Sequence, residues 1–248
     1  MSARFPVVAA ALAALALAGT ASSGPSLTET CIQPGDGASV VQFAARDGTA
    51  LVGVVFGAGS RGVVLGHRRY SDLCEWRAYA LRLAGLGYRV LAFDFRGYGS
   101  SGPAATAKTW SRLDQDISAA VGKLRDLGAE KVVVVGASMA GTASLVATAL
   151  LKPKADAVVS LSGPRDYGTL RALPAARKLR LPVLYLAAQR DGLYAADARR
   201  LFRATKSKDK KLFLLAGSDH GSDLLQGAAA ESASTLLETF LTRVTATP

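Results

Sequence analysis

Three residues of this chain have side chains whose types and order indicate nucleophilic catalysis: Ser138, Asp191 and His220. A serine hydroxyl is a poor nucleophile near neutral pH, so it needs a base such as histidine, and the histidine needs an acid that orients it. Serine, acid, histidine is one of the chain orders in which such triads occur. These residues therefore predict acyl transfer through a serine, provided that the fold brings them together.

The residues around Ser138 predict a sharp turn between a strand and a helix. Four consecutive valines precede the turn, a run too short for a helix and apolar on both faces, as in a buried parallel strand. The motif G-A-S-M-A-G then spans Gly136 to Gly141, and the alanine- and leucine-rich segment 142–151 is predicted to be a helix. Small neighbours tolerate the strained backbone that exposes a serine hydroxyl at such a turn. Because Ala140 stands where a second glycine is usual, the motif alone also fits an ordinary strand-to-helix turn.

Strands and helices alternate along the rest of the chain. A hairpin followed by strict alternation predicts a mostly parallel sheet covered on both faces, with ligands beyond the carboxyl ends of the strands. Ser138, Asp191 and His220 each follow a predicted strand, so we expect them at one edge of the sheet. The predicted strands are 40–45, 50–56, 61–67, 88–94, 131–135, 157–161, 181–187 and 211–215, and the predicted helices are 75–86, 111–127, 142–151, 167–178, 195–204 and 229–244.

With these elements in place, the sequence resembles the α/β-hydrolase family over essentially the whole chain after residue 21. The resemblance rests on G-A-S-M-A-G, on R-D-G at 190–192, on S-D-H-G at 218–221 and on D-F-R-G-Y-G-S-S at 94–101. Within the family, the chain is similar to small, lidless serine esterases of the dienelactone-hydrolase type. The resemblance implies the α/β-hydrolase fold: a mostly parallel central sheet, helices on both faces and an N-terminal antiparallel hairpin.

The resemblance also implies a role for each member of the triad. Ser138 would be the nucleophile, His220 the general base and later the general acid, and Asp191 the residue that orients His220. Asp219 is the alternative acid, but it adjoins His220 along the chain and is poorly placed to reach the imidazole. The implied activity is that of a carboxylesterase acting on small or accessible esters through an acyl-enzyme, without a cofactor.

The expected oxyanion hole combines the backbone N–H of Met139 with one from the loop after His67. That loop departs from the family pattern: the family usually has His-Gly-x-x-Gly there, whereas this chain has His67 followed by Arg68, Arg69 and Tyr70. By position Arg69 is favoured as the second donor, with Arg68 left open, and His67 is interpreted as structural. We also expect one of the arginines, or Tyr70, to contact the substrate, since a guanidinium favours an anionic group; both arginines pointing to solvent is the alternative.

The segment 162–181 leaves room for little more than one helix, so no large lid is predicted and 163–167 would line the rim of an open site. An acyltransferase or a peptidase would use the same triad, and a non-catalytic binding protein of the cell envelope could use the same fold.

The glycine pattern at 97–102 matches a dinucleotide-binding motif. However, Pro103 follows it instead of a helix, and no acidic residue ends the next strand, so a dinucleotide-binding site is not predicted.

The N-terminus predicts export. Arg4, the apolar run 5–18 and small residues up to position 21 together match a secretory signal peptide, 1–21, which would place the protein outside the cell or in the cell envelope. A flexible lead-in, 22–37, and a single domain, 38–248, would follow.

Two cysteines, Cys31 and Cys74, remain after such a cleavage. In an oxidising compartment a disulfide is the simplest expectation, although two free, buried thiols remain open. Two histidines and two cysteines without suitable spacing predict no metal site.

The formal net charge of the chain is +11. A basic secreted protein would adhere to anionic envelope polymers or lipid head groups. No aromatic interleaving or known reader motif accompanies the charge, so nucleic acid is not an expected partner. A cationic surface that confers only solubility is the other interpretation.

Overall fold

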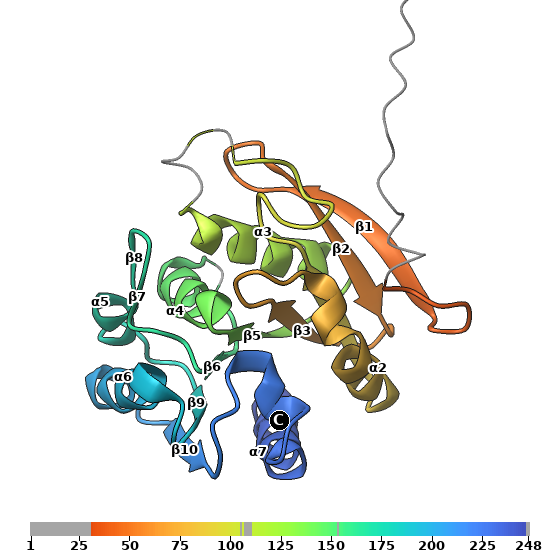
Figure 1. The fold of residues 1–248 in the computed structure, drawn as a ribbon. Coiled ribbons are helices and arrows are strands. Elements are labelled where there is room, and N and C mark those ends of the chain that lie inside the picture. Colours follow the sequence, from red (N-terminus) through yellow and green to blue (C-terminus); the bar gives the residue numbers. More distant parts are fainter. Residues whose placement is uncertain (1–30, 105, 107–110, 153, 247–248) are drawn as a thin grey trace, which may run out of the picture.

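One sheet of eight strands forms the centre of the molecule. The computed structural model describes residues 31–246 except 105, 107–110 and 153. The strands lie in the order β1-β2-β4-β3-β5-β6-β9-β10 (Figure 1). The pairs β1–β2 and β2–β4 are antiparallel, and every pair from β4 to β10 is parallel, as the sequence predicts. The strands are β1 (Ala38–Ala44), β2 (Ala50–Phe56), β3 (Arg61–Gly66), β4 (Tyr88–Phe93), β5 (Lys131–Ala137), β6 (Ala157–Leu161), β9 (Val183–Ala188) and β10 (Lys210–Leu215).

Helices cover both faces of this sheet (Figure 1). Helices α2 and α7, with the short 3₁₀ helices η1 and η2, pack on one face, whereas α3, α4, α5 and α6 pack on the other. None of the helices in the described residues is long and apolar enough to cross a membrane. Their bounds are η1 (Leu73–Trp76), α2 (Arg77–Gly85), α3 (Leu113–Asp126), α4 (Met139–Leu150), α5 (Ala172–Ala176), α6 (Gly192–Ala204), η2 (Gly221–Leu225) and α7 (Ala230–Thr245).

The valine run of β5 lies in the middle of the sheet, between β3 and β6. Val133 and Val135 belong to the apolar core under α2 and α7, whereas Val132 and Val134 belong to the core under α3 and α4. All four side chains are fully buried. A strand that is apolar on both faces is therefore explained by two separate cores, one on each side of the sheet.

The segment predicted to be a helix over 167–178 has a different structure. Two short antiparallel strands, β7 (Asp166–Tyr167) and β8 (Leu170–Arg171), precede α5, which has only five residues. Gly168 has a φ of +54° at the turn between these strands, a conformation that favours glycine over other residues. The helix therefore begins at Ala172 instead of residue 167, because the turn at Gly168 precedes it.

A disulfide joins Cys31 to Cys74, with 4.9 Å between their Cα atoms. Cys74 lies in η1, so the bond fastens the segment before β1 to this 3₁₀ helix. The two cysteines are 43 residues apart. Closing a loop of this length stabilises the folded state by about 4 kcal/mol in the chain-entropy model.

Candidate active site

Ser138 lies on the turn between β5 and α4 in a strained backbone conformation. Its φ is +51° and its ψ is −114°, which a residue with a side chain adopts only when the surroundings enforce it. The backbone N–H of Ser138 donates to the carbonyl oxygen of Leu161 at 2.8 Å, which fastens the turn to β6. A Cβ at Gly136 would lie 2.2 Å from the carbonyl oxygen of Ala140, so glycine is required there.

The fold brings Ser138, His220 and Asp191 together at the carboxyl edge of the sheet. Asp191 follows β9, and His220 lies in the loop between β10 and η2. The Nδ1 of His220 lies 2.9 and 3.0 Å from the two carboxylate oxygens of Asp191, and its Nε2 lies 2.8 Å from Ser138 Oγ. An aspartate on Nδ1 favours the tautomer whose proton is on that nitrogen, which leaves Nε2 free to accept the serine proton.

Burial distinguishes the three side chains. Asp191 is 7% exposed and Ser138 9%, whereas the His220 side chain is 27% exposed. The ring of Tyr194 covers the imidazole, with 4.1 Å between the ring centroids. Sequence reasoning missed Tyr194. It stands three residues after Asp191, on the first turn of α6, and this spacing could have predicted that its ring lies near Asp191 and His220.

Asp219, the alternative acid, points away from this arrangement. Its carboxylate lies against Gly227, where a Cβ would be only 2.3 Å from Oδ2. Among the described residues, Oδ2 has no hydrogen-bond partner, and the hydrogen bonds of the imidazole go to Asp191 and Ser138. The geometry thus places Asp191, and not Asp219, against His220.

The loop after His67 places its two arginines differently. The backbone N–H of Arg68 donates to Glu75 Oε1 at 3.0 Å, and the Arg68 guanidinium contacts Glu75 at 3.3 Å and also binds Asp223. Arg69 is exposed, with its guanidinium 4.3 Å from the centroid of the Tyr70 ring. In the part of the chain that the structure describes, the backbone N–H groups of Arg69 and Met139 have no acceptor.

Glu75 holds this loop from a buried position. Its side chain is only 6% exposed, and burial raises the pKa of the carboxyl group, an effect that hydrogen bonds from Ser71 and Arg68 oppose. Sequence reasoning missed Glu75 because it lies in η1, seven residues along the chain from Arg68.

His67 is fully buried and joins two loops. Its Nε2 accepts the backbone N–H of Phe95 at 3.1 Å, so the proton of the neutral ring is on Nδ1, which donates to the carbonyl oxygen of Arg68 at 2.7 Å. The rings of Phe95 and Tyr98 pack edge-on against it. Burial lowers the pKa of His67 to about 4.

His67 should make the protein less stable in mild acid. Its pKa is lower in the folded protein, about 4, than in the unfolded chain, so the unfolded chain binds the proton first. The contribution of neutral His67 to the free energy of unfolding is complete above pH 6.5 and is lost as the pH falls toward 4. The loss between pH 7 and pH 5 should be about 2 kcal/mol. Urea unfolding at both pH values would measure it. A His67→Gln variant should lose less stability over the same interval; an equal loss in both proteins would contradict the assignment.

A model of the α/β hydrolase fold matches residues 69–218, more than half of the chain. The chain belongs to the α/β hydrolase family. Among curated proteins it is similar to epoxide hydrolase B of Mycobacterium tuberculosis, 42% identical over 74 residues that make up 30% of this chain and 20% of that protein. The chain therefore aligns with only about a fifth of that relative's length.

Solved structures resemble this hydrolase over most of its length. An esterase of Pyrococcus furiosus has a TM-score of 0.70 at 20% identity and covers 83% of this chain and 92% of its own. A monoacylglycerol lipase of Paleococcus ferrophilus has a TM-score of 0.64 at 19% identity and covers 79% and 99%. At these identities the likeness shows the fold.

In this hydrolase the D-F-R-G-Y-G-S-S stretch is a scaffold for the loop that carries His67. The carboxylate of Asp94 accepts the backbone N–H groups of Leu73 and Ser100, each at 2.8 Å. Gly99 has a φ of +47°, and a Cβ there would lie 2.0 Å from Asp94 Oδ2. Tyr98 donates its hydroxyl to Met139 Sδ at 3.6 Å, next to Ser138 along the chain.

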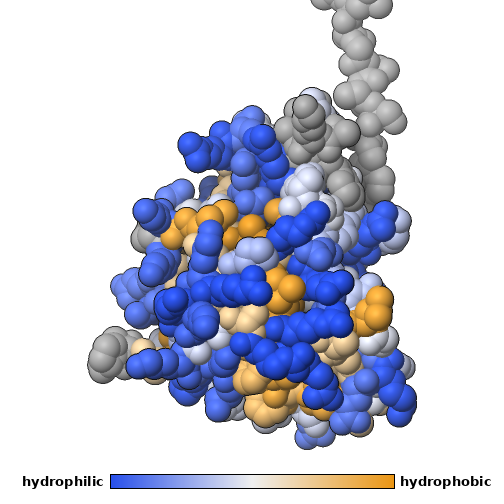
Figure 2. Space-filling model, turned by 90° about the vertical axis from the view of Figure 1, so that its left-hand side faces the viewer, coloured by the Kyte–Doolittle hydropathy of each residue, from blue (hydrophilic) through white to orange (hydrophobic). Residues whose placement is uncertain are grey.

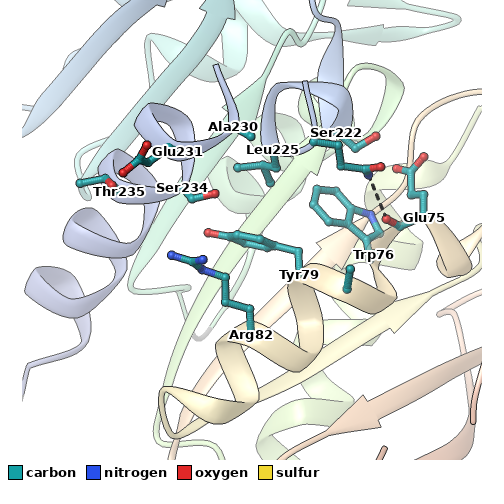
Figure 3. Close-up of a pocket in the computed structure, with 12 residues that line it drawn as sticks. Glu75, Trp76, Tyr79, Arg82, Ser222, Leu225, Ala230, Glu231, Ser234 and Thr235 are labelled. Carbon is teal, nitrogen blue, oxygen red and sulfur yellow. Dashed lines mark hydrogen bonds between the residues drawn. The ribbon is translucent and has the colours of Figure 1, made fainter. Parts of the chain in front are cut away.

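A hollow of about 560 Å³ lies between α2, η2 and α7 (Figure 3). Trp76 and Tyr79 line it from one side, and Leu225 and Ser234 from the other. Ser138 is not among its lining residues, so a substrate of Ser138 would not lie there. Glu75 lines this hollow and also accepts the backbone N–H of Arg68 in the loop after His67.

Proposed function

We propose that this α/β hydrolase is a serine hydrolase that cleaves carboxylic esters through an acyl-enzyme. The observation that carries the proposal is the hydrogen-bonded series from Ser138 Oγ to His220 Nε2 and from His220 Nδ1 to Asp191. A base in contact with the nucleophile, itself oriented by a buried carboxylate, is what a serine needs to attack a carbonyl group.

In the proposed reaction, His220 Nε2 takes the proton of Ser138 while Oγ attacks the ester carbonyl carbon. The negative charge that develops on the carbonyl oxygen would be stabilised by the backbone N–H groups of Met139 and Arg69. Arg69 is preferred to Arg68 because the Arg68 N–H already donates to Glu75. The imidazolium then protonates the leaving alcohol, and a water molecule deprotonated by His220 hydrolyses the acyl-enzyme.

Serine at the nucleophile position favours an ester over an epoxide, although a relative of this chain is named an epoxide hydrolase. Attack of a serine hydroxyl on an epoxide carbon would form an ether, which water activated by a histidine does not cleave. Attack on an ester forms an acyl-enzyme whose carbonyl the same water can attack. The likeness to a solved esterase and a monoacylglycerol lipase agrees with this choice.

The short segment between β6 and β9 supports a small or accessible substrate. It contains only β7, β8 and the five-residue α5. An acyltransferase would use the same acyl-enzyme with an alcohol in place of water, and a peptidase would use the same triad on an amide. Product analysis with and without added alcohols would separate transfer from hydrolysis.

Labelling with a fluorophosphonate tests the proposal without knowledge of the substrate, because the probe reacts with activated serines. The mature protein should gain one adduct by intact-mass measurement, and Ser138→Ala and His220→Ala should gain none. A well-folded wild-type protein that stays unlabelled would refute the serine hydrolase and favour a non-catalytic binding protein.

Arg69 should favour anionic ester substrates. Its guanidinium is exposed and has no carboxylate partner among the described residues, whereas that of Arg68 is bound by two. We expect Arg69→Glu to lower kcat/KM for an ester that carries a free carboxylate about tenfold more than for its neutral analogue. Tyr70→Phe, which keeps the ring under the guanidinium, is the matched control. An equal effect of Arg69→Glu on both esters would eliminate the idea.

Export of the protein is a further part of the proposal. The predicted signal peptide, 1–21, lies outside the described residues. The disulfide between Cys31 and Cys74 supports an oxidising destination, since such bonds rarely persist in the cytosol. N-terminal sequencing of the protein purified from its native envelope or medium should begin near Ser22; a chain that begins at Met1 would contradict export.

A further inference from the structure

Most of the net positive charge of this chain comes from one stretch. Residues 165–211 contain thirteen basic and four acidic residues, a net charge of +9 out of +11 for the whole chain. This stretch forms β7, β8, α5, β9, α6 and the start of β10. The charge is therefore concentrated on the part of the molecule where α5 and α6 cover the sheet.

Helix α5 packs between α4 and α6, and a hollow lies on each side of it. The hollow toward α6, about 420 Å³, has an apolar floor of Leu173 and Ala204. Its remaining lining is cationic: Arg177, Arg200, Arg203 and Lys206. We call these four cations and Lys178 the basic face.

The second hollow, about 210 Å³, lies between α5 and α4 and is mostly apolar. Val146, Leu150 and Pro174 line it, and Leu150 is 59% exposed. Lys178 and Arg171 stand at its margin. The side of the molecule that carries β8, α5 and α6 accordingly shows apolar patches between hydrophilic side chains (Figure 2).

Most cations of the basic face are free to bind an external anion. Arg200 lies 3.4 Å from Asp197, its carboxylate partner. Within the described part of the chain, Arg177, Lys178, Arg203 and Lys206 are exposed and have no carboxylate within ion-pair distance. Uncompensated charges of one sign around an apolar floor match a partner that offers both anionic groups and hydrocarbon.

We propose that the basic face binds the surface of a bilayer that contains anionic phospholipids. The cations would contact the phosphate groups, and Leu150 and Pro174 would enter the apolar margin of the bilayer. A soluble anionic polymer would satisfy the charges but would leave these apolar side chains without a partner. The proposal does not depend on the esterase proposal, because no residue of the triad belongs to the basic face.

The basic face lies away from the edge of the sheet that carries Ser138. It surrounds the segments that lead into the amino ends of β9 and β10, where the N–H of Lys206 donates to Ala176 O and Ser207 Oγ donates to Arg180 O. Asp191 and His220 follow the carboxyl ends of these two strands. A protein bound through the basic face would therefore keep its catalytic edge open to solvent.

Co-sedimentation with vesicles tests the proposal. The full mature chain should bind phosphatidylcholine vesicles containing about one third phosphatidylglycerol, and should not bind pure phosphatidylcholine vesicles. The variant Arg177→Glu/Arg203→Glu should bind at least about tenfold more weakly. The control Arg46→Glu/Arg112→Glu carries the same change of net charge on exposed residues elsewhere and should bind within about twofold of wild type. Equal weakening by both variants, or no binding by the wild type, would overturn the basic face.

A second variant separates a lipid from a polymer. Leu150→Asn should weaken vesicle binding and leave binding to dextran sulfate unchanged, because only the bilayer offers hydrocarbon to this side chain. If Leu150→Asn leaves vesicle binding unchanged while the charge reversals abolish binding to both, the partner is a polyanion and the lipid proposal is wrong. Circular dichroism, unchanged in every variant, verifies the fold.

Discussion

Replacing Ser138 with alanine should lower kcat for an activated acetate ester by at least about 10⁴-fold. The substitution removes the atom that would form the acyl-enzyme in the proposed reaction, and the remaining rate would come from substrate binding and the oxyanion donors. Because the three residues act as a unit, His220→Ala should cost about as much, and the double variant should be no worse than either single one. Initial rates at saturating substrate would measure all three proteins.

Stability should respond quite differently at this position. The positive φ of Ser138 strains any residue with a Cβ, so Ser138→Ala keeps the strain and should unfold within about 1 kcal/mol of wild type. Ser138→Gly relieves the strain and should be more stable than Ser138→Ala by about 1 kcal/mol.

The control for the activity measurement is Ser218→Ala, which changes an exposed serine in the loop before His220. A Ser138→Ala protein that keeps more than about a hundredth of wild-type activity would show that another group is the nucleophile.

Much of this site was predictable because local chemistry determines it. Ser138 needs glycine two residues before it, where a Cβ would strike Ala140, and the buried strand before it needs apolar residues on both faces. Both demands leave a pattern within ten residues of sequence. The parallel sheet then brings Asp191 and His220 to the same edge, since each follows the carboxyl end of a neighbouring strand.

The remaining features depend on contacts between distant segments, which no local pattern records. The Arg68 guanidinium binds Asp223, 155 residues away, whereas Arg69 of the same loop is exposed. Tyr194 covers His220 only because β9 and β10 are adjacent. The helix expected over 167–178 is shorter for the opposite reason: a local turn at Gly168 delays its start to Ala172.

The second large effect should be on stability, at the buried ion pair of Arg96 with Asp116. Both side chains are fully buried, and their closest atoms are 2.6 Å apart. Asp116 comes from α3 and also accepts the backbone N–H of Arg96, while Asp47 from the β1–β2 turn binds the other side of the guanidinium at 2.7 Å. Burial raises the pKa of Asp116, an effect that Arg96 opposes, and Arg96 lowers the pKa of Asp47 to about 2.

We expect Asp116→Ala to lower the free energy of unfolding by about 3 to 5 kcal/mol, because it leaves the buried guanidinium with one carboxylate instead of two. Urea unfolding followed by circular dichroism measures this loss. The matched control is Asp126→Ala, an exposed aspartate at the end of the same helix, which should cost less than about 0.5 kcal/mol. A loss at Asp116 no larger than at Asp126 would contradict the role of the pair.

The double variant Arg96→Met/Asp116→Ala distinguishes an ion pair from simple packing. If the cost of Asp116→Ala is mainly the unpaired charge it leaves behind, then removing that charge should recover part of the stability, and the double variant should unfold less easily than the sum of the single changes predicts. Packing alone would give additive losses. Neither residue bonds to the triad, so kcat of the folded fraction should stay close to wild type at low temperature. The same change would thus reduce the amount of active protein and leave the chemistry at Ser138 intact.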